Sequence, residues 1–151
     1  MDLLDLNVIS ALLKNGRATW TDLASHVGLT SPAVAERVKK LEEQKIIKGY
    51  AANVDYRAMG FAVPALVFVT LAQPQHRASF IQFVERCHEV IECMHITGDD
   101  DYMIKVICRD TQHLDELLSN GIKSIPGVLK TRTMVILSTQ KERAIHIPEV
   151  K

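Results

Sequence analysis

A pair of short helical segments separated by a very short linker constrains the fold of this sequence most strongly. The first segment begins near Thr21-Asp22 and ends at Gly28. The second begins at Thr30 or Ser31 and has Pro32 in its first turn, where a missing N–H is tolerated. The residues expected to face inward are Leu23, Ala24, Val27, Val34, Val38 and Leu41. Two helices held by a tight turn predict a helix-turn-helix over residues 20–39.

Elements on both sides of this pair extend it into a domain. An apolar stripe at Leu6, Ile9 and Leu13 predicts an earlier helix, which Asn15-Gly16 ends. After the pair, residues 46–54 are typical of short extended structure with a tight turn at Gly49. We therefore predict a winged helix-turn-helix domain over residues 1–60.

The outer face of the second helix suits DNA. A rotation of about 100° per residue places Ala33, Arg37 and Lys40 on one flank. The whole chain has zero net charge, but residues 37–48 hold five cations against two glutamates. The residues predicted to bind DNA are Thr30, Ser31, Ala33, Glu36, Arg37, Lys39 and Lys40. The alternative interpretation is a solvated face on which Glu36 pairs with Lys40.

The second half of the chain alternates strand and helix patterns. Strands are expected over residues 65–71, 91–97, 101–108 and 128–137, with helices over 76–90 and 114–122. The order βαββαβ is that of a ferredoxin-like domain, which we place at residues 61–151. The predicted fold class is therefore α+β.

The predicted sheet is apolar on both faces. The first strand has Ala65, Val67 and Val69 on one side and Leu66 and Phe68 on the other. Helices cover one face of such a sheet, so the other needs a second cover. Another copy of the protein is the most economical cover, which predicts at least a homodimer.

Several other kinds of protein do not fit. No apolar run approaches the roughly 18 residues of a membrane span, and the acidic start differs from a signal peptide, so we expect a cytoplasmic protein without a membrane partner. No catalytic motif occurs, and we expect neither an enzyme nor a cofactor. The three cysteines show no CxxC spacing. The group Cys87, His88, Cys93 and His95 matches no common zinc pattern, so no metal site is expected.

The segment Gly98-Asp99-Asp100-Asp101 lies between two predicted strands. It can be a simple hairpin turn, since Gly and Asp tolerate the required backbone angles. It can also hold an amino acid, with loop N–H groups on the carboxylate and Asp99 or Asp101 on the ammonium group. A hard-cation site is a weaker third interpretation, because adjacent carboxylates on one turn do not all converge.

The chain resembles the Lrp/AsnC, or feast/famine, family of prokaryotic transcription factors over nearly its whole length. The order and spacing of several short motifs carry the resemblance. These are Leu4-Asp5, Gly16-Arg17, Leu23-Ala24, Val27-Gly28-Leu29, residues 36–42, Ile47-Lys48-Gly49-Tyr50, residues 98–102, Lys105-Val106, Pro126-Gly127-Val128 and Thr131-Arg132-Thr133. One departure is Lys45, where the family usually has Gly; in a left-handed conformation Lys costs about 1 kcal/mol more than Gly.

The resemblance implies a winged helix-turn-helix joined to a ligand-binding ferredoxin-like domain, dimers that often build octamers, and modulation by amino acids. It implies that the effector lies at the turn between the two strands, near the last strand. The effector-binding residues so predicted are Gly98, Asp99, Asp100, Asp101, Tyr102, Thr131 and Thr133. The additional negative charge of Asp100 would favour a basic effector or change the response.

Two alternatives remain at this point. One is an architectural protein that organises the nucleoid by wrapping DNA with little sequence preference and no effector. The other is a small-molecule-binding or catalytic ferredoxin-like protein whose N-terminal helices only mediate contacts.

Overall fold

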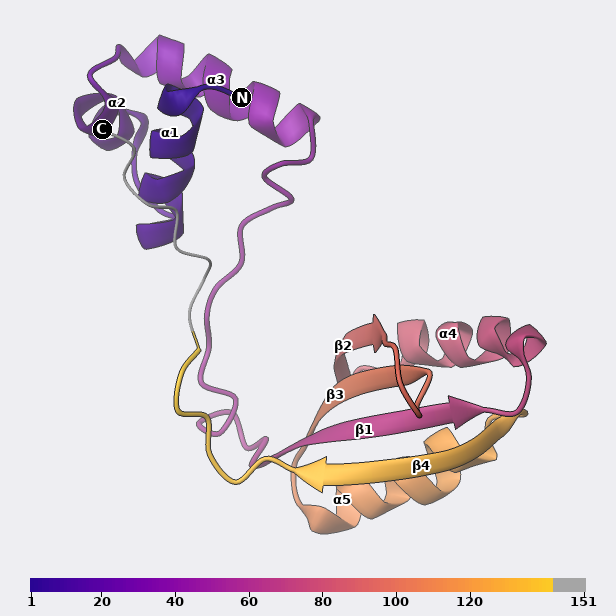
Figure 1. The fold of residues 1–151 in the computed structure, drawn as a ribbon. Helices are drawn as coiled ribbons and strands as arrows, with labels where there is room; N and C mark the ends of the chain where they lie inside the picture. Colours follow the sequence, from indigo (N-terminus) through magenta and orange to yellow (C-terminus); the bar gives the residue numbers. More distant parts are fainter. Residues whose placement is uncertain (143–151) are drawn as a thin grey trace. The chain divides into compact units, whose positions relative to one another are not determined.

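The computed structural model describes residues 1–142 and divides the chain into two compact units, residues 1–53 and residues 54–140 (Figure 1). The predicted second domain, 61–151, extends over residues 143–151, which lie outside the described residues. The N-terminal unit contains three helices, α1 (Leu3–Lys14), α2 (Trp20–Val27) and α3 (Ser31–Glu43). No helix within residues 1–142 is long and apolar enough to cross a membrane.

Side chains at the start of α1 and α2 fix where these helices begin. Asp2 and Asp5 form a reciprocal capping box on α1, and Thr19 and Asp22 form one on α2. Because Thr19 is the N-cap, α2 begins at Trp20, slightly earlier than the apolar pattern predicts. Thr30 is the N-cap of α3, but its side chain makes no capping hydrogen bond.

The predicted core of the helix-turn-helix is confirmed. Leu23, Val34, Val38 and Leu41 are each at most 2% exposed. The predicted stripe of α1 is wrong, because Val8 is fully buried whereas Leu13 is 39% exposed. Helix α1 is apolar on more than one side, so its own periodicity does not select the buried face. Contact with α2 and α3 selects it.

Beyond α3 the chain turns through Lys45, whose φ is 58°. The N–H groups of Ile46 and Ile47 both donate to the Leu41 carbonyl, which closes the end of the helix. No strand forms between Glu43 and Val63 within the described chain, so the extended wing over residues 46–54 is not paired here. A strand needs a second strand for its N–H and C=O groups, and residues 46–54 find none.

Replacing Lys45 with glycine should stabilise the N-terminal unit. At φ 58° a side chain is strained and glycine is not. We expect Lys45→Gly to raise the free energy of unfolding by about 1 kcal/mol. Urea denaturation followed by the fluorescence of Trp20 measures this, with Lys48→Gly as the control. A Lys45→Gly variant that is no more stable than the wild type would contradict the expectation.

The C-terminal unit has the predicted ferredoxin-like topology. Its elements are β1 (Val63–Leu71), α4 (Arg77–Arg86), β2 (Val90–His95), β3 (Tyr102–Cys108), α5 (Thr111–Glu116) and β4 (Val128–Val135). A short 3-10 turn, Pro74–His76, precedes α4, and the helical path of α5 continues through Leu117–Gly121 and Ile122–Ser124. The four strands form one antiparallel sheet in the order β2-β3-β1-β4.

The largest error among the predicted boundaries is at the end of α4, which is Arg86 rather than Val90. Helix α5 begins at Thr111 rather than Leu114, and β4 ends at Val135 rather than Leu137. Cys87 has extended backbone angles, and the chain turns there so that Val90 can begin β2. The apolar residues Cys87 and Val90 fit a helix and a strand equally well, and only pairing with β3 decides between them.

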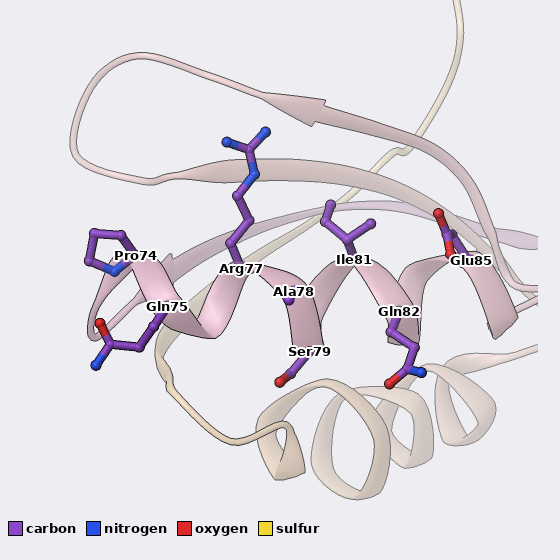
Figure 2. Close-up of a pocket in the computed structure, with 8 residues that line it drawn as sticks. All are labelled: Pro74, Gln75, Arg77, Ala78, Ser79, Ile81, Gln82 and Glu85. Atoms are coloured by element: carbon purple, nitrogen blue, oxygen red, sulfur yellow. The ribbon is translucent and has the colours of Figure 1, made fainter.

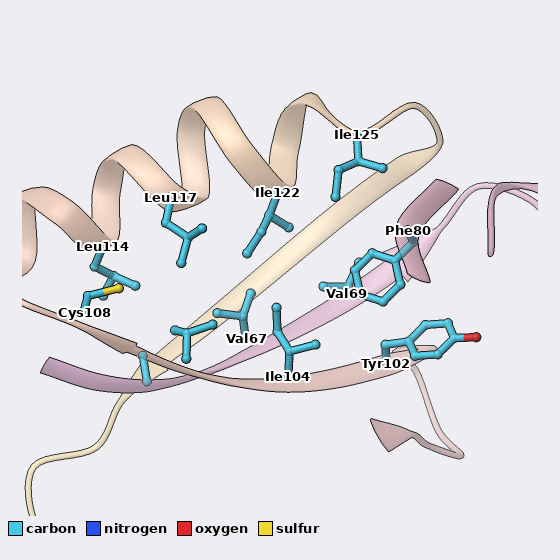
Figure 3. Packing of buried hydrophobic residues seen from close by; sticks show 12 residues of the cluster. Val67, Val69, Phe80, Tyr102, Ile104, Cys108, Leu114, Leu117, Ile122 and Ile125 are labelled. Carbon is cyan, nitrogen blue, oxygen red and sulfur yellow. The ribbon is translucent and has the colours of Figure 1, made fainter. Parts of the chain in front are cut away.

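The hydrophobic core lies on one face of the sheet, under both helices. Figure 3 shows Leu117 and Ile122 directed toward Val67 of β1, and Leu114 beside Cys108 of β3. Phe80 from α4 is fully buried against Tyr102, with ring centres 4.9 Å apart. The predicted inward residues of β1, Ala65, Val67 and Val69, are all fully buried.

Neither α4 nor α5, the two α-helices of the C-terminal unit, covers the side chains on the opposite face of the sheet. The register places Leu66 directly across from Met134, and Phe68 directly across from Met103 and Arg132. Met94 lies across from Met103 on the same face. We call this the open face and define it by Leu66, Phe68, Met94, Met103, Arg132 and Met134.

Candidate functional site

The outer side of α3 presents the predicted DNA-binding residues. Val34, Val38 and Leu41 anchor the helix inward, which leaves Glu36, Lys39 and Lys40 exposed. Ser31 and Ala33 are partly exposed and Thr30 is exposed at the helix N-terminus. Because the Thr30 side chain makes no capping bond, first-turn N–H groups remain available to an anion.

The sequence analysis predicted that the Arg37 side chain is free to bind DNA. In the structure it is instead paired with two carboxylates. Its Nη1 donates at 2.7 Å both to Asp2 Oδ2 and to Asp5 Oδ1, and its side chain is 29% exposed. Together with the Asp5 N–H group, this guanidinium lowers the pKa of Asp2. Arg37 therefore ties α3 to the start of α1, and it would have to leave two carboxylates to reach DNA.

The two lysines of α3 are held only weakly. Lys40 Nζ lies 3.8 Å from Glu36 Oε1, as the alternative interpretation predicted, and Lys39 Nζ lies 3.9 Å from Glu43 Oε1. All four side chains are more than 60% exposed, and such surface pairs contribute little. Both lysines can exchange their glutamate for a phosphate.

The turn after β2 distributes its three aspartates to different surroundings. Asp99 is exposed, Asp100 is only 7% exposed, and Asp101 is partly buried. Asp100 accepts hydrogen bonds from Arg132 Nη2 at 2.7 Å and Thr70 Oγ1 at 3.1 Å. The carboxylate of Asp100 is thus paired with the Arg132 guanidinium.

Asp101 is held on β1. Its N–H donates to the Val69 carbonyl at 3.0 Å, and its Oδ2 accepts from the Leu71 N–H at 2.7 Å. These bonds fix the turn against the end of the central strand. They also place Asp101 beside a hollow of about 280 Å³.

This hollow, which we call the Tyr102 hollow, combines two opposite charges with apolar and aromatic walls. The Arg77 guanidinium lies 5.9 Å from the centre of the Tyr102 ring, and the His95 ring stacks on Tyr102 at 4.9 Å. Its lining consists of Leu71, Ala72, Gln73, Pro74, Arg77, His95, Asp101 and Tyr102. A cation and an anion that line the same hollow match the charged head group of a free amino acid.

The hydroxyl of Tyr102 gives independent support for a ligand. It is buried and has no hydrogen-bond partner among the described residues. Figure 3 shows it directed away from Ile104 and the core. A buried hydroxyl without a partner costs about 1–3 kcal/mol, which a bound polar group would remove.

A second, shallower hollow of about 820 Å³ runs along the outside of α4. Figure 2 shows Arg77 projecting from the start of this helix on the side away from Ser79 and Gln82. Pro74 and Arg77 border both hollows, so the two adjoin one another.

The structure brings together only some of the predicted effector residues. Asp101 and Tyr102 line the Tyr102 hollow, whereas Gly98, Asp99 and Asp100 do not. Thr131 lies across from Val69 and Thr133 across from Val67, on the helix-covered face but outside this hollow. Sequence reasoning missed Arg77, whose only signal is a basic residue soon after Pro74 at a predicted helix start.

The cysteine and histidine residues form no metal centre within residues 1–142. Cys87 Sγ donates to Glu89 Oε2 at 3.2 Å, and His113 Nε2 lies 3.1 Å from Glu89 Oε1. Burial and, to a smaller extent, the nearby Glu89 carboxylate raise the pKa of the Cys87 thiol to about 11. The thiol is therefore protonated at neutral pH and unreactive.

These features define a class of protein, a helix-turn-helix transcriptional regulator with an attached ligand-binding domain. Residues 1–42 match the AsnC-type helix-turn-helix domain, and residues 64–145 match the Lrp/AsnC ligand-binding domain. The chain belongs to the Lrp/AsnC family of transcriptional regulators.

Curated relatives and solved structures agree with this membership. The Bkd operon transcriptional regulator of Pseudomonas aeruginosa is 33% identical over 141 residues, 92% of each chain. The leucine-responsive regulatory protein of Haemophilus influenzae is 31% identical over 94% of this chain and 87% of its own. A feast or famine regulatory protein of Mycobacterium tuberculosis, solved with L-methionine, has a TM-score of 0.90 at 31% identity, with 97% of this chain and 99% of that chain covered.

Proposed function

We propose that this regulator binds duplex DNA by placing α3 in the major groove and senses an amino acid in the Tyr102 hollow. The observation that supports DNA binding is the exposed side of α3. The buried residues Val34, Val38 and Leu41 lie on the opposite side of this helix. Residues 1–60 act as the DNA-binding domain and residues 61–151 as the ligand-sensing and oligomerisation domain. The protein works in the cytoplasm, associated with the nucleoid, because chromosomal DNA is its partner.

The residues at the DNA interface are divided by role. Lys39 and Lys40 contact phosphates, and the N-terminus of α3 with Thr30 and Ser31 binds another phosphate. Ala33 and Glu36 face the groove, where small Ala33 permits close approach and Glu36 accepts from a cytosine amino group. Arg37 positions α3 through Asp2 and Asp5 rather than reading a base.

Binding to its own promoter and to random duplex DNA at one salt concentration tests this function. A sequence-specific regulator binds the promoter about 10³-fold or more tightly. Equal affinities would favour the architectural alternative, a protein that organises DNA without an effector. Absence of binding to both at low salt would overturn the assignment.

The open face supports self-association. Phe68 and Leu66 are only partly covered, and Met94 and Met134 are 38% and 45% exposed. A second copy of this chain is the occupant that we propose, because α4 and α5 of the C-terminal unit both pack on the other face of the sheet. A homodimer results, and four such dimers can assemble further to an octamer.

For the effector, we expect Arg77 to bind the carboxylate, Asp101 the ammonium group, and Tyr102 a polar atom of the ligand. Arg77→Gln should weaken binding of L-methionine or L-leucine by roughly 10- to 100-fold, since a charge-assisted bond is lost. Tyr102→Phe should weaken it by about tenfold. Isothermal titration calorimetry measures both.

The matched control is Arg86→Gln, which removes an exposed arginine from the other end of α4. It should bind like the wild type. Equal binding by all three variants would place the effector elsewhere, and no binding of any of the 20 amino acids to the wild type would exclude an amino-acid effector.

A further inference from the structure

A third hollow lies at the other end of the sheet from the Tyr102 hollow. Its volume is about 290 Å³, close to that of the Tyr102 hollow, and suits a small metabolite. It is formed where the chain enters β1 and β2 and leaves β3, beside α5. We call it the Arg109 hollow and define it by its lining, which consists of Phe61, His88, Glu89, Arg109 and His113.

Glu89 is the one carboxylate among the described residues of this lining, and protein donors already bind it. Its Oε2 accepts from Cys87 Sγ at 3.2 Å, and its Oε1 lies 3.1 Å from His113 Nε2. The Arg109 N–H donates to His113 Nδ1 at 3.3 Å, so the proton of this imidazole is on Nε2 and points to Glu89. Both oxygens of Glu89 are therefore engaged within the protein.

The hydrogen bonds also fix the charge of Glu89. Burial raises the pKa of this carboxyl group, but bonds from its own N–H, from Cys87 and from His113 outweigh burial and lower the pKa below its usual value. Glu89 is therefore ionised at neutral pH. Its negative charge repels a second anion only partly, because two donors already lie against it.

Two other side chains of the lining have donors that are not used. Arg109 and His88 are exposed, and within residues 1–142 neither the Arg109 guanidinium nor the His88 ring has a hydrogen-bond or ion-pair partner. A guanidinium presents two parallel N–H groups that match a carboxylate. Phe61 is partly buried and adds an aromatic wall. Unused donors, an engaged carboxylate and an aromatic wall together suit an anion attached to an apolar body.

We propose that the Arg109 hollow is a second small-molecule site, which binds an organic acid that carries a carboxylate and an apolar body but no ammonium group. Arg109 binds the carboxylate, His88 adds a second donor, and Phe61 packs against the apolar body. An amino acid binds less tightly, because its ammonium group meets two cationic or donor side chains and a Glu89 whose oxygens are engaged. The site does not depend on the proposed function, since it shares no lining residue with the Tyr102 hollow.

Matched ligands test the class of acid on the full chain. 3-Phenylpropanoate has the skeleton of L-phenylalanine without the ammonium group, and inorganic phosphate is an anion without an apolar body. Calorimetry on Arg77→Gln, which removes the cation of the Tyr102 hollow, isolates the Arg109 hollow. 3-Phenylpropanoate should bind this variant at least about tenfold more tightly than either other ligand. Equal or tighter binding of L-phenylalanine or phosphate, or no binding of 3-phenylpropanoate, overturns the proposal.

Arg109→Gln, added to the Arg77→Gln chain, tests the residue that holds the carboxylate. It should weaken binding of 3-phenylpropanoate by roughly tenfold or more, since a charge-assisted bond is lost. The backbone N–H that bonds His113 is retained, and thermal melts identify any loss of folding. Arg86→Gln is the matched control, because Arg86 is an exposed arginine close in the chain that does not line the hollow. Equal affinities of the Arg109→Gln and Arg86→Gln chains overturn the site.

Glu89→Gln, in the same background, distinguishes an anionic ligand from one with an ammonium group. It removes a negative charge beside the ligand, while the amide oxygen still accepts from His113. 3-Phenylpropanoate should therefore bind about two- to fivefold more tightly. Weaker binding by a variant that melts like its parent overturns the proposal, because Glu89 then holds a ligand cation. The proposed function stands in each of these cases, since its own tests measure DNA binding and the Tyr102 hollow.

Discussion

Gly127→Ala is expected to destabilise the C-terminal unit by about 2–4 kcal/mol. A Cβ atom on Gly127 would lie 1.9 Å from His76 Cγ and 2.3 Å from His76 Nδ1, and φ at Gly127 is 87°. The close atoms belong to the base of the imidazole ring rather than to the tip of a flexible chain. The 3-10 turn before α4 and the start of β4 would therefore have to separate.

Gly60→Ala isolates the part of this effect that comes from the contact with His76. Gly60 has the same φ of 87°, but nothing lies within 4 Å of its added Cβ. This variant should lose only about 1 kcal/mol. Hydrogen exchange of the β1 and β3 amides in the full chain measures the stability of the C-terminal unit separately from that of the helices. If Gly127→Ala and Gly60→Ala lose equal stability, the added Cβ at Gly127 avoids His76 without an energetic cost.

Replacing Lys39 and Lys40 together with alanine is expected to weaken DNA binding by roughly 10- to 100-fold at low salt. If both lysines contact phosphates, the slope of log affinity against log salt falls by about two. The loss should be similar for the promoter and for random DNA, because phosphates carry no sequence information. Fluorescence anisotropy at several salt concentrations measures all three quantities.

Glu36→Gln and Glu43→Gln are the controls for helix stability. They break the same pairs, Glu36–Lys40 and Lys39–Glu43, but retain both lysines. Affinity for random DNA should stay the same or increase, because no carboxylate then competes with phosphate for the ammonium groups. A loss of promoter selectivity in Glu36→Gln would indicate that Glu36 contacts a base. A double lysine variant with the salt slope of the wild type would remove α3 from the phosphate interface.

The ion pairs of Arg37 show what local sequence patterns do not predict. The helical periodicity placed Arg37 correctly on the outer flank of α3, but its partners Asp2 and Asp5 lie 35 and 32 residues away in the chain. Nothing in the local pattern distinguishes a cation that meets DNA from one that meets another helix. The same limit explains why α1 buries Val8 rather than Leu13.

The sequence by itself determined the helix-turn-helix, the βαββαβ order, the two-sided apolar strands and the position of the turn at residues 98–101. These follow from periodicity, caps and turn residues, which act over a few neighbouring positions. Only the tertiary structure decided that Arg77 joins Asp101 and Tyr102 around one hollow, and that Asp100 turns to the opposite face to bind Arg132. The physical reason is that strand pairing brings together residues far apart in the chain, so the partner of a charged side chain is fixed by the register of the sheet.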